Sequence, residues 1–132
     1  MQRNPTIAVI DDDSSVLKAL GRLLSDCGYN TELFASAGEF LTAAPTSEAA
    51  CLLVDVGLGD MSGLEMVSRL SVAGFKFPFI FMSGFADDEF RTQAKALGCI
   101  TFLQKPFAPD LLIAVLKKTF ESDLPSESNE PV

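Results

Sequence analysis

The sequence predicts an α/β fold built around a parallel five-stranded sheet. Short apolar runs alternate with segments of helical periodicity five times along the chain, and two of these runs are apolar throughout. A parallel strand covered by helices on both faces has this continuous apolar character. Charged side chains also follow three of the five runs. The carboxyl ends of parallel strands share one edge of a sheet, and ligands bind there.

The first part of the chain predicts two strands and two helices. Ile7–Ile10 is an apolar strand. The next helix places apolar residues on one face and ends at Gly28, a residue suited to a helix C-terminus. Asn30–Phe34 is more polar, which is typical of an edge strand. Ser36–Glu39 forms a capping box for a short helix that ends by Pro45.

The middle of the chain predicts a further strand, a helix and a fourth strand. Cys51–Val54 is apolar throughout. After a loop, Ser62–Glu65 forms a second capping box, and its helix stops near Gly74. Pro78–Met82 is the fourth strand, and proline is acceptable as the first residue of a strand.

The last part predicts two helices around a fifth strand. Residues 90–97 have apolar side chains at helical spacing and are followed by Gly98. Ile100–Leu103 is the strand. Pro109 suits the first position of the last helix, which runs to Phe120 with four apolar residues toward the core: Leu112, Val115, Leu116 and Phe120.

Length and composition indicate one domain and an acidic tail. A chain of 132 residues with 48% apolar residues can form one core, which we assign to residues 1–120. Residues 121–132 carry four acids and no base. This composition predicts a disordered tail or a linker to a further domain.

Charge and cysteine content limit the functions open to the chain. A net charge of −8 without a basic stripe argues against direct binding of nucleic acid or of a membrane surface. The sequence has no secretion signal and no apolar run of membrane-spanning length. Its three cysteines are far apart, and it has no histidine, which argues strongly against a structural zinc site. These features predict a cytoplasmic protein with free thiols.

Three consecutive acids follow the first predicted strand. Helix capping explains Asp13 but not Asp11 and Asp12, whose mutual repulsion has a cost unless a cation is bound. Asp55 follows the third strand and Lys105 the fifth, so a parallel sheet places them at the same edge. Hard oxygen ligands suit Mg²⁺ or Mn²⁺. We therefore interpret the three carboxylates of Asp11, Asp12 and Asp55 as a metal site.

The same residues are suited to phosphoryl chemistry. A carboxylate such as Asp55, beside a metal ion, can act as a nucleophile, and Lys105 can neutralise phosphoryl oxygens. Ser83 ends the fourth strand, where its hydroxyl can donate to a phosphoryl oxygen; taken singly, it reads as a serine that caps the next helix. Phe102, by itself, reads as a core or half-exposed aromatic residue.

From about Thr6 to Phe120 the chain resembles the receiver domain of two-component response regulators. The resemblance rests on motifs in a specific order and spacing: Val9–Asp13, Leu53–Asp55 with Asp60–Gly63, Met82–Gly84, and Phe102–Phe107. Asp60–Gly63 and Lys105–Phe107 are most similar to the nitrogen-fixation regulator subfamily. The resemblance implies a flavodoxin-like, doubly wound sheet with strand order 2-1-3-4-5.

The resemblance also implies roles for individual residues. Asp55 would accept a phosphoryl group from the phosphohistidine of a histidine kinase or phosphotransfer protein. The metal ligands would be Asp11, Asp12, Asp55 and the backbone carbonyl of Gly57. Ser83 would be the switch hydroxyl, Lys105 the phosphate-binding lysine and Phe102 the switch aromatic. The Lys105–Pro106 bond would be cis.

Such a domain is not a conventional enzyme, although it catalyses its own Mg²⁺-dependent phosphorylation and dephosphorylation. The resemblance implies an effector domain or target protein downstream, with transcription regulation as one output. It is also compatible with a homodimer through residues 90–97, 100–103 and 109–120. Two departures stand out: Gly59 replaces a usual proline, which predicts a more mobile loop, and serine replaces the commoner threonine at Ser83.

Other functions remain open at this point. The domain can be an interaction module that signals without phosphorylation. Asp11–Asp13 is superficially similar to a metal motif of topoisomerase-primase domains. Asp55–Gly57 is similar to the nucleophile strand of haloacid dehalogenases, which requires a second aspartate where this chain has Gly57. Rapid phosphoester turnover favours the enzymes, whereas one stoichiometric labelling event favours a receiver.

Overall fold

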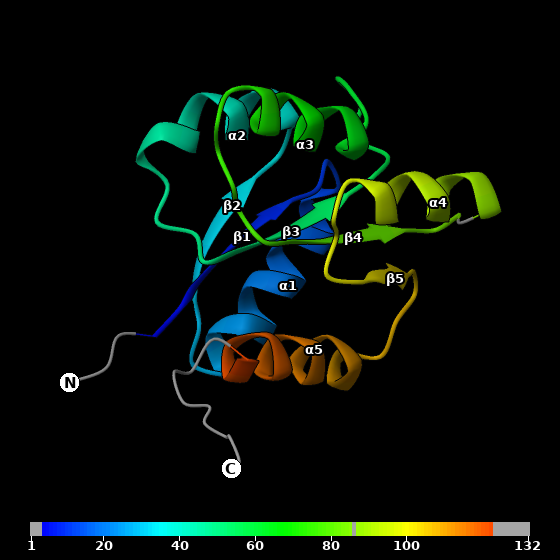
Figure 1. The fold of residues 1–132 in the computed structure, drawn as a ribbon. Helices are drawn as coiled ribbons and strands as arrows, with labels where there is room; N and C mark the ends of the chain where they lie inside the picture. Colours follow the sequence, from blue (N-terminus) through cyan, green and yellow to red (C-terminus); the bar gives the residue numbers. More distant parts are fainter. Residues whose placement is uncertain (1–3, 86, 123–132) are drawn as a thin grey trace, which may run out of the picture.

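Five parallel strands form one sheet in the order β2-β1-β3-β4-β5 (Figure 1). The computed structural model describes residues 4–85 and 87–122. The strands are β1 (Thr6–Ile10), β2 (Asn30–Phe34), β3 (Cys51–Asp55), β4 (Phe79–Ser83) and β5 (Phe102–Gln104). The predicted fold class and strand order are confirmed, and the polar strand β2 lies at an edge of the sheet as expected.

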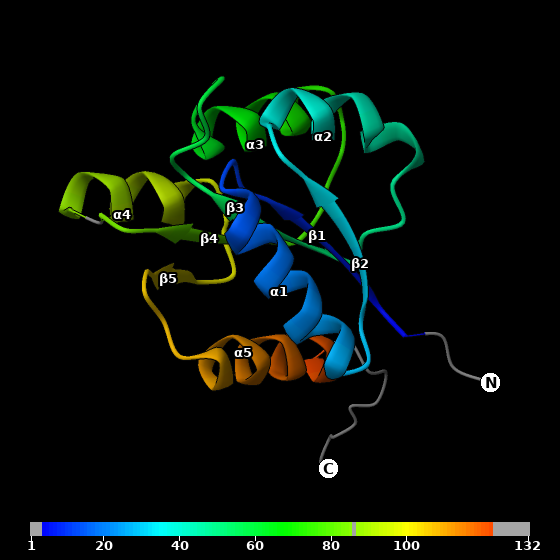
Figure 2. The same ribbon diagram turned by 180° about the vertical axis from the view of Figure 1, so that it is seen from behind.

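Helices cover both faces of the sheet, so the structure has three layers (Figures 1 and 2). The helices α2, α3 and α4 pack on one face, and α1 and α5 pack on the other. Their bounds are α1 (Ser14–Asp26), α2 (Ala37–Ala43), α3 (Gly63–Val72), α4 (Asp88–Ala96) and α5 (Pro109–Ser122), with a 3₁₀ turn at Ala44–Thr46. Every helix among the described residues is too short or too polar to cross a bilayer.

The central strands supply both halves of the core by alternation. In β1, Ala8 and Ile10 face α2 and α3, whereas Ile7 and Val9 face α1 and α5. The strands β3 and β4 alternate in the same way, and all five residues of each are buried. Because both faces are covered, these strands need apolar residues at every position until they reach the edge of the sheet.

Helix starts follow the predicted capping pattern. The Ser36 hydroxyl accepts from the Glu39 N–H, and the Glu39 carboxylate accepts from the N–H of Ala35, the residue before the cap, one position earlier than in a standard capping box. The Ser62 hydroxyl accepts from the Glu65 N–H, but the Glu65 carboxylate pairs with Arg69 one turn later. The second box is therefore only half formed.

Several boundaries differ from the sequence prediction by one or two residues; β4, for example, spans Phe79–Ser83 rather than Pro78–Met82. Strand β5 begins at Phe102 rather than at Ile100, whose N–H donates to the Phe79 carbonyl while its side chain is 40% exposed. Helix α5 begins at Pro109 as predicted and continues to Ser122, so it includes the first two residues of the segment assigned to the tail. The rest of that segment, 123–132, lies outside the described residues.

Candidate functional site

The two acids after β1 have different environments. Asp11 is fully buried; its Oδ1 accepts from the Asp13 N–H at 2.9 Å, and its Oδ2 accepts from Lys105 Nζ at 2.9 Å. Asp12 is exposed. Asp13 caps α1 by accepting from the Ser15 and Val16 N–H groups, so the capping interpretation holds for this residue.

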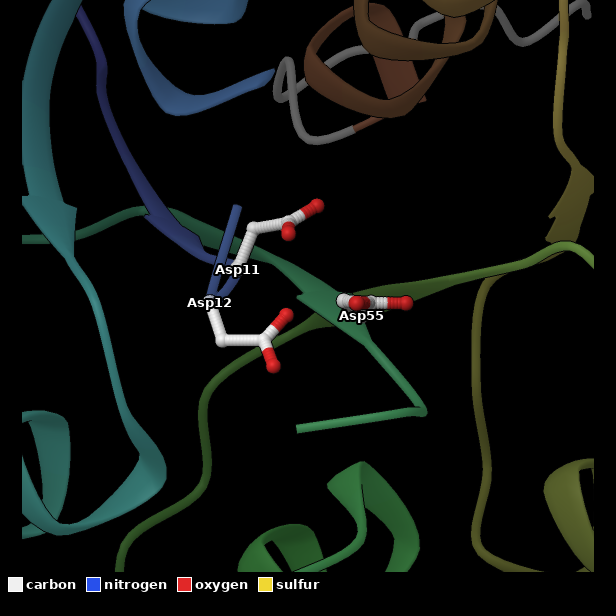
Figure 3. A group of neighbouring side chains, drawn as sticks. All are labelled: Asp11, Asp12 and Asp55. Atoms are coloured by element: carbon white, nitrogen blue, oxygen red, sulfur yellow. The ribbon is translucent and has the colours of Figure 1, made fainter. Parts of the chain in front are cut away.

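Asp55 and Lys105 complete the cluster from other strands. Asp55 is the last residue of β3, and Lys105 follows β5. Lys105 Nζ lies 3.5 Å from Asp55 Oδ1, and the side chains of Lys105 and Asp55 are 26% and 11% exposed. Figure 3 shows Asp11 and Asp12 at the end of β1 beside Asp55 at the end of β3. Strand ends that are far apart in sequence therefore share one site.

The electrostatics of this site disfavour a second buried negative charge. Burial raises the pKa of the Asp55 carboxyl, and the nearby Asp11 charge raises it further; these effects outweigh Lys105 and the Gly57 N–H, which lower it. Burial would lower the pKa of Lys105, but its hydrogen bond to Asp11 and the charges of Asp55 and Asp11 more than offset this, so the pKa is raised. The Lys105 ammonium thus pairs with two carboxylates, those of Asp11 and Asp55.

These carboxylates fit a divalent cation. Asp11, Asp12 and Asp55 each offer one oxygen, and the three oxygens lie within 4.8 Å of one another. Two of the three side chains are buried, where excess negative charge is costly, and all three donors are hard oxygens. The donor set suits Mg²⁺ or Mn²⁺ better than a softer metal.

The loop after Asp55 lies beside this cluster. Gly57 is exposed, and its N–H donates to Asp55 Oδ1 at 3.4 Å. At Gly59, an added Cβ would lie 3.6 Å from Asp12 Oδ2. Both glycines therefore border the carboxylates.

Ser83 ends β4 and is 8% exposed. Its carbonyl accepts from the Lys105 N–H at 2.7 Å, which holds the backbones of the two segments together. Its hydroxyl, however, donates to the Phe85 carbonyl at 2.7 Å and accepts from the Phe85 N–H at 3.0 Å. The structure thus brings the Ser83 backbone to Lys105, while the hydroxyl is engaged by the following loop.

Phe102 is half-buried at the start of β5. Its ring packs edge-on against Phe90, with centroids 5.0 Å apart, and the Arg91 guanidinium lies 5.1 Å from its centroid. Both partners belong to α4, so Phe102 joins β5 to that helix. The peptide bond between Lys105 and Pro106 is cis, the geometry that the resemblance implied.

Sequence reasoning did not anticipate three contacts that shape this region. Asp60 was noted only as part of a motif, yet its carboxylate accepts from the backbone N–H groups of Ala37 and Gly38 in α2. The backbone of Phe85 holds the Ser83 hydroxyl, and Arg91 covers Phe102. An acid within a glycine-rich loop was a usable signal for Asp60. Backbone groups and surface arginines give no comparable signal.

The fold and the cluster define a doubly wound α/β protein with an acidic cluster at the carboxyl edge of its sheet, the edge where proteins of this architecture bind ligands. Residues 7–117 match the response regulator receiver domain, and the chain belongs to this family. The predicted recognition is confirmed. The matched segment contains every acid of the cluster as well as Lys105.

Individual relatives agree with this family. The chain is 34% identical to the response regulator protein TodT of Pseudomonas putida, a match that covers 98% of this chain and 57% of TodT. It is 33% identical to the transcriptional regulatory protein FixJ of Bradyrhizobium diazoefficiens, over 96% of this chain and 62% of FixJ. The chain therefore spans about six-tenths of these relatives. The FixJ match confirms the predicted subfamily resemblance.

A solved structure shows the same fold. The crystal structure of a CheY-like response regulator receiver domain protein from Methanospirillum hungatei superposes with a TM-score of 0.84 at 26% sequence identity. The match covers 90% of this chain and 95% of the other. The receiver fold thus accounts for nearly the whole described part of this chain.

Proposed function

We propose that this domain accepts a phosphoryl group on Asp55 from the phosphohistidine of a histidine kinase or phosphotransfer protein, in a Mg²⁺-dependent reaction. The observation that carries the proposal is the position of Lys105 Nζ, 2.9 Å from Asp11 and 3.5 Å from Asp55. The Lys105 ammonium therefore pairs with both the proposed nucleophile, Asp55, and the neighbouring carboxylate of Asp11. A bound Mg²⁺ would supply further positive charge to the phosphoryl oxygens.

The transfer step follows from these groups. An Asp55 carboxylate oxygen attacks phosphorus, while the P–N bond breaks and its electron pair returns to the imidazole. The product is an acyl phosphate on Asp55. Lys105 stabilises the negative charge of the phosphoryl oxygens, for which its raised pKa keeps it protonated at neutral pH. Attack by water on the same phosphorus breaks the bond between phosphorus and the Asp55 oxygen, releases inorganic phosphate and regenerates the carboxylate.

The proposed switch uses Ser83 and Phe102. To donate to a phosphoryl oxygen, the Ser83 hydroxyl has to give up its hydrogen bond to the Phe85 carbonyl, because it has only one proton to donate. The charged acceptor on Asp55 compensates for this loss, because hydrogen bonds to ionised groups are stronger than neutral ones. Movement at Ser83 changes the space beside β5, and Phe102 transmits it to α4 through Phe90 and Arg91.

Receiver domains of response regulators interact with histidine kinases and with effector domains. For this chain we propose the same partners, an output that regulates transcription, and a cytoplasmic location. A surface formed by α4, β5 and α5 would contact the partner or a second copy. The net charge of −8 favours an output through protein contacts rather than through direct contact between this domain and nucleic acid.

Labelling with acetyl phosphate and Mg²⁺ tests the proposal. We expect stoichiometric incorporation into the unmodified chain, and none into Asp55→Asn or without Mg²⁺. Glu65→Gln, on the exposed face of α3, is the matched control and should be labelled normally. Incorporation into Asp55→Asn at the unmodified level would refute the assignment. Absence of Mg²⁺ binding and of labelling in the unmodified chain would instead favour an interaction module that works without phosphorylation.

A further inference from the structure

The loop between β3 and α3 has to be held in place if its backbone is to help bind a cation. It contains Gly57, whose carbonyl is a proposed ligand, and Gly59, which lies next to Asp12. Glycine has more backbone freedom than any other residue, so two glycines so close together raise the entropic cost of ordering this segment. Leu58, between them, is buried in the core and fixes the apolar side of the loop.

Asp60 fixes the polar side of the same loop. Its Oδ2 accepts from the Gly38 N–H at 2.9 Å, and its Oδ1 accepts from the Ala37 N–H at 3.2 Å. The hydrogen bond from Gly38 is the largest of the effects that hold the pKa of Asp60 below its usual value. Ala37 and Gly38 begin α2, so their N–H groups have no acceptor within that helix. Asp60 therefore joins the loop to α2 by charge-assisted hydrogen bonds.

The helix α2 is a firm support for this contact. Ala37 and Phe40 are fully buried, and the Phe40 ring packs edge-on against Phe34 and Phe77. The helices α2 and α3 lie side by side on the same face of the sheet (Figures 1 and 2). A loop attached to α2 is thus attached to the core.

Gly38 provides an independent way to disturb the contact. A Cβ at this position would lie 3.3 Å from Asp60 Oδ2, closer than most Cβ contacts. Alanine at 38 therefore crowds the Asp60 carboxylate, which has to shift by a few tenths of an ångström while it keeps its charge. Because alanine also favours helix formation, it should not weaken α2 itself.

We propose that Asp60 is a positioning residue for the cation site. By joining the loop to α2, it holds Gly57 and Gly59 beside Asp12 and Asp55, and so it strengthens Mg²⁺ binding without touching the cation. This inference rests on the proposed function, which supplies the cation. The same contacts predict a less mobile loop than its two glycines alone indicate, because Leu58 packs in the core and Asp60 is hydrogen-bonded to α2.

Calorimetric titration with MgCl₂ tests the inference, with the dissociation constant as its readout. We expect Asp60→Ala to weaken Mg²⁺ binding about ten-fold, the usual scale for a group that orients ligands, and Gly38→Ala to weaken it about three-fold. The double variant should match Asp60→Ala, because both substitutions act on the same contact and Asp60→Ala already removes it. Glu65→Ala, which removes an exposed acid from α3, is the control, and its Mg²⁺ dissociation constant should stay within two-fold of that of the unmodified chain.

Two further measurements separate positioning from a general structural role. At saturating Mg²⁺, Asp60→Ala should be labelled by acetyl phosphate at the unmodified rate, and Gly38→Ala should unfold at no lower urea concentration than the unmodified chain. Unchanged dissociation constants in Asp60→Ala and Gly38→Ala would overturn the inference while leaving the proposed function intact. Failure of the unmodified chain to bind Mg²⁺ would overturn both.

Discussion

Replacing Lys105 by methionine removes the ammonium from the acidic cluster and retains an apolar side chain of similar length. Asp11 is fully buried and would lose a 2.9 Å charge-assisted hydrogen bond, a loss of about 1.5–3 kcal/mol. Breaking a fully buried ion pair costs about 3–5 kcal/mol. The Lys105 side chain is 26% exposed, and Asp11 keeps its hydrogen bond from the Asp13 N–H, so the smaller of these two stability losses applies. We expect a loss of about 2–3 kcal/mol.

Urea unfolding at pH 7 without divalent cations measures this loss. Far-UV circular dichroism is the suitable probe, because the chain has one tyrosine and no tryptophan. The exposed Lys117 on α5 gives the matched control, and Lys117→Met should change the unfolding free energy by less than about 0.5 kcal/mol. Addition of Mg²⁺ should reduce the difference in unfolding free energy between Lys105→Met and the unmodified chain, because Mg²⁺ neutralises the same carboxylates.

The stability that Lys105 contributes depends on pH in a defined direction. Because the folded state raises the pKa of Lys105 above 10.5, the stability from this lysine is fully present below that value and is lost as the pH rises through the folded pKa. The difference in unfolding free energy between the unmodified chain and Lys105→Met should therefore persist at neutral pH and shrink in strong alkali. Equal unfolding free energies at pH 7 without divalent cations would refute the reasoning.

Three other substitutions give distinct expected results. Because the folded state raises the pKa of Asp55, its ionised form destabilises the fold, and this effect is relieved as the pH falls through the folded pKa. Asp55→Asn should thus raise the unfolding free energy at pH 7 by about 1 kcal/mol in urea unfolding. A lower unfolding free energy in this variant would contradict the reasoning. Gly63→Ala places a Cβ 2.7 Å from the Asp55 carbonyl and should cost about 1–3 kcal/mol in the same assay, whereas an unchanged midpoint would mean that the backbone yields freely. Ser83→Ala removes both hydrogen bonds to the Phe85 backbone, so α4 amides should exchange faster while labelling of Asp55 persists; loss of labelling would place Ser83 in the transfer step itself.

The sheet and its acidic edge were predictable because they follow from local sequence patterns. The continuous apolar runs of β1 and β3 require two covered faces, and the acids that follow each run can then lie only at the carboxyl edge. Asp13 was assigned correctly to capping from its place before a helix. The start of β5 was predicted wrongly. Ile100 has strand propensity, but the chain joins the sheet only at Phe102.

Other features of the site depend on loop paths that the sequence does not encode locally. The partner of Asp60 lies more than twenty residues away on α2, so no spacing rule reveals it. The Ser83 hydroxyl was expected to face the phosphoryl site, and its engagement by Phe85 depends on the course of the β4–α4 loop. The Arg91 contact with Phe102 likewise requires the angle at which α4 crosses β5.

Localisation of the phosphoryl group tests the central claim most directly. Treatment with acetyl phosphate and Mg²⁺, reduction of the acyl phosphate with borohydride and peptide mass spectrometry identify the modified carboxylate. The account predicts a single modified residue, Asp55, next to the Lys105 ammonium. Modification of another acid, or no modification at saturating Mg²⁺, would contradict it.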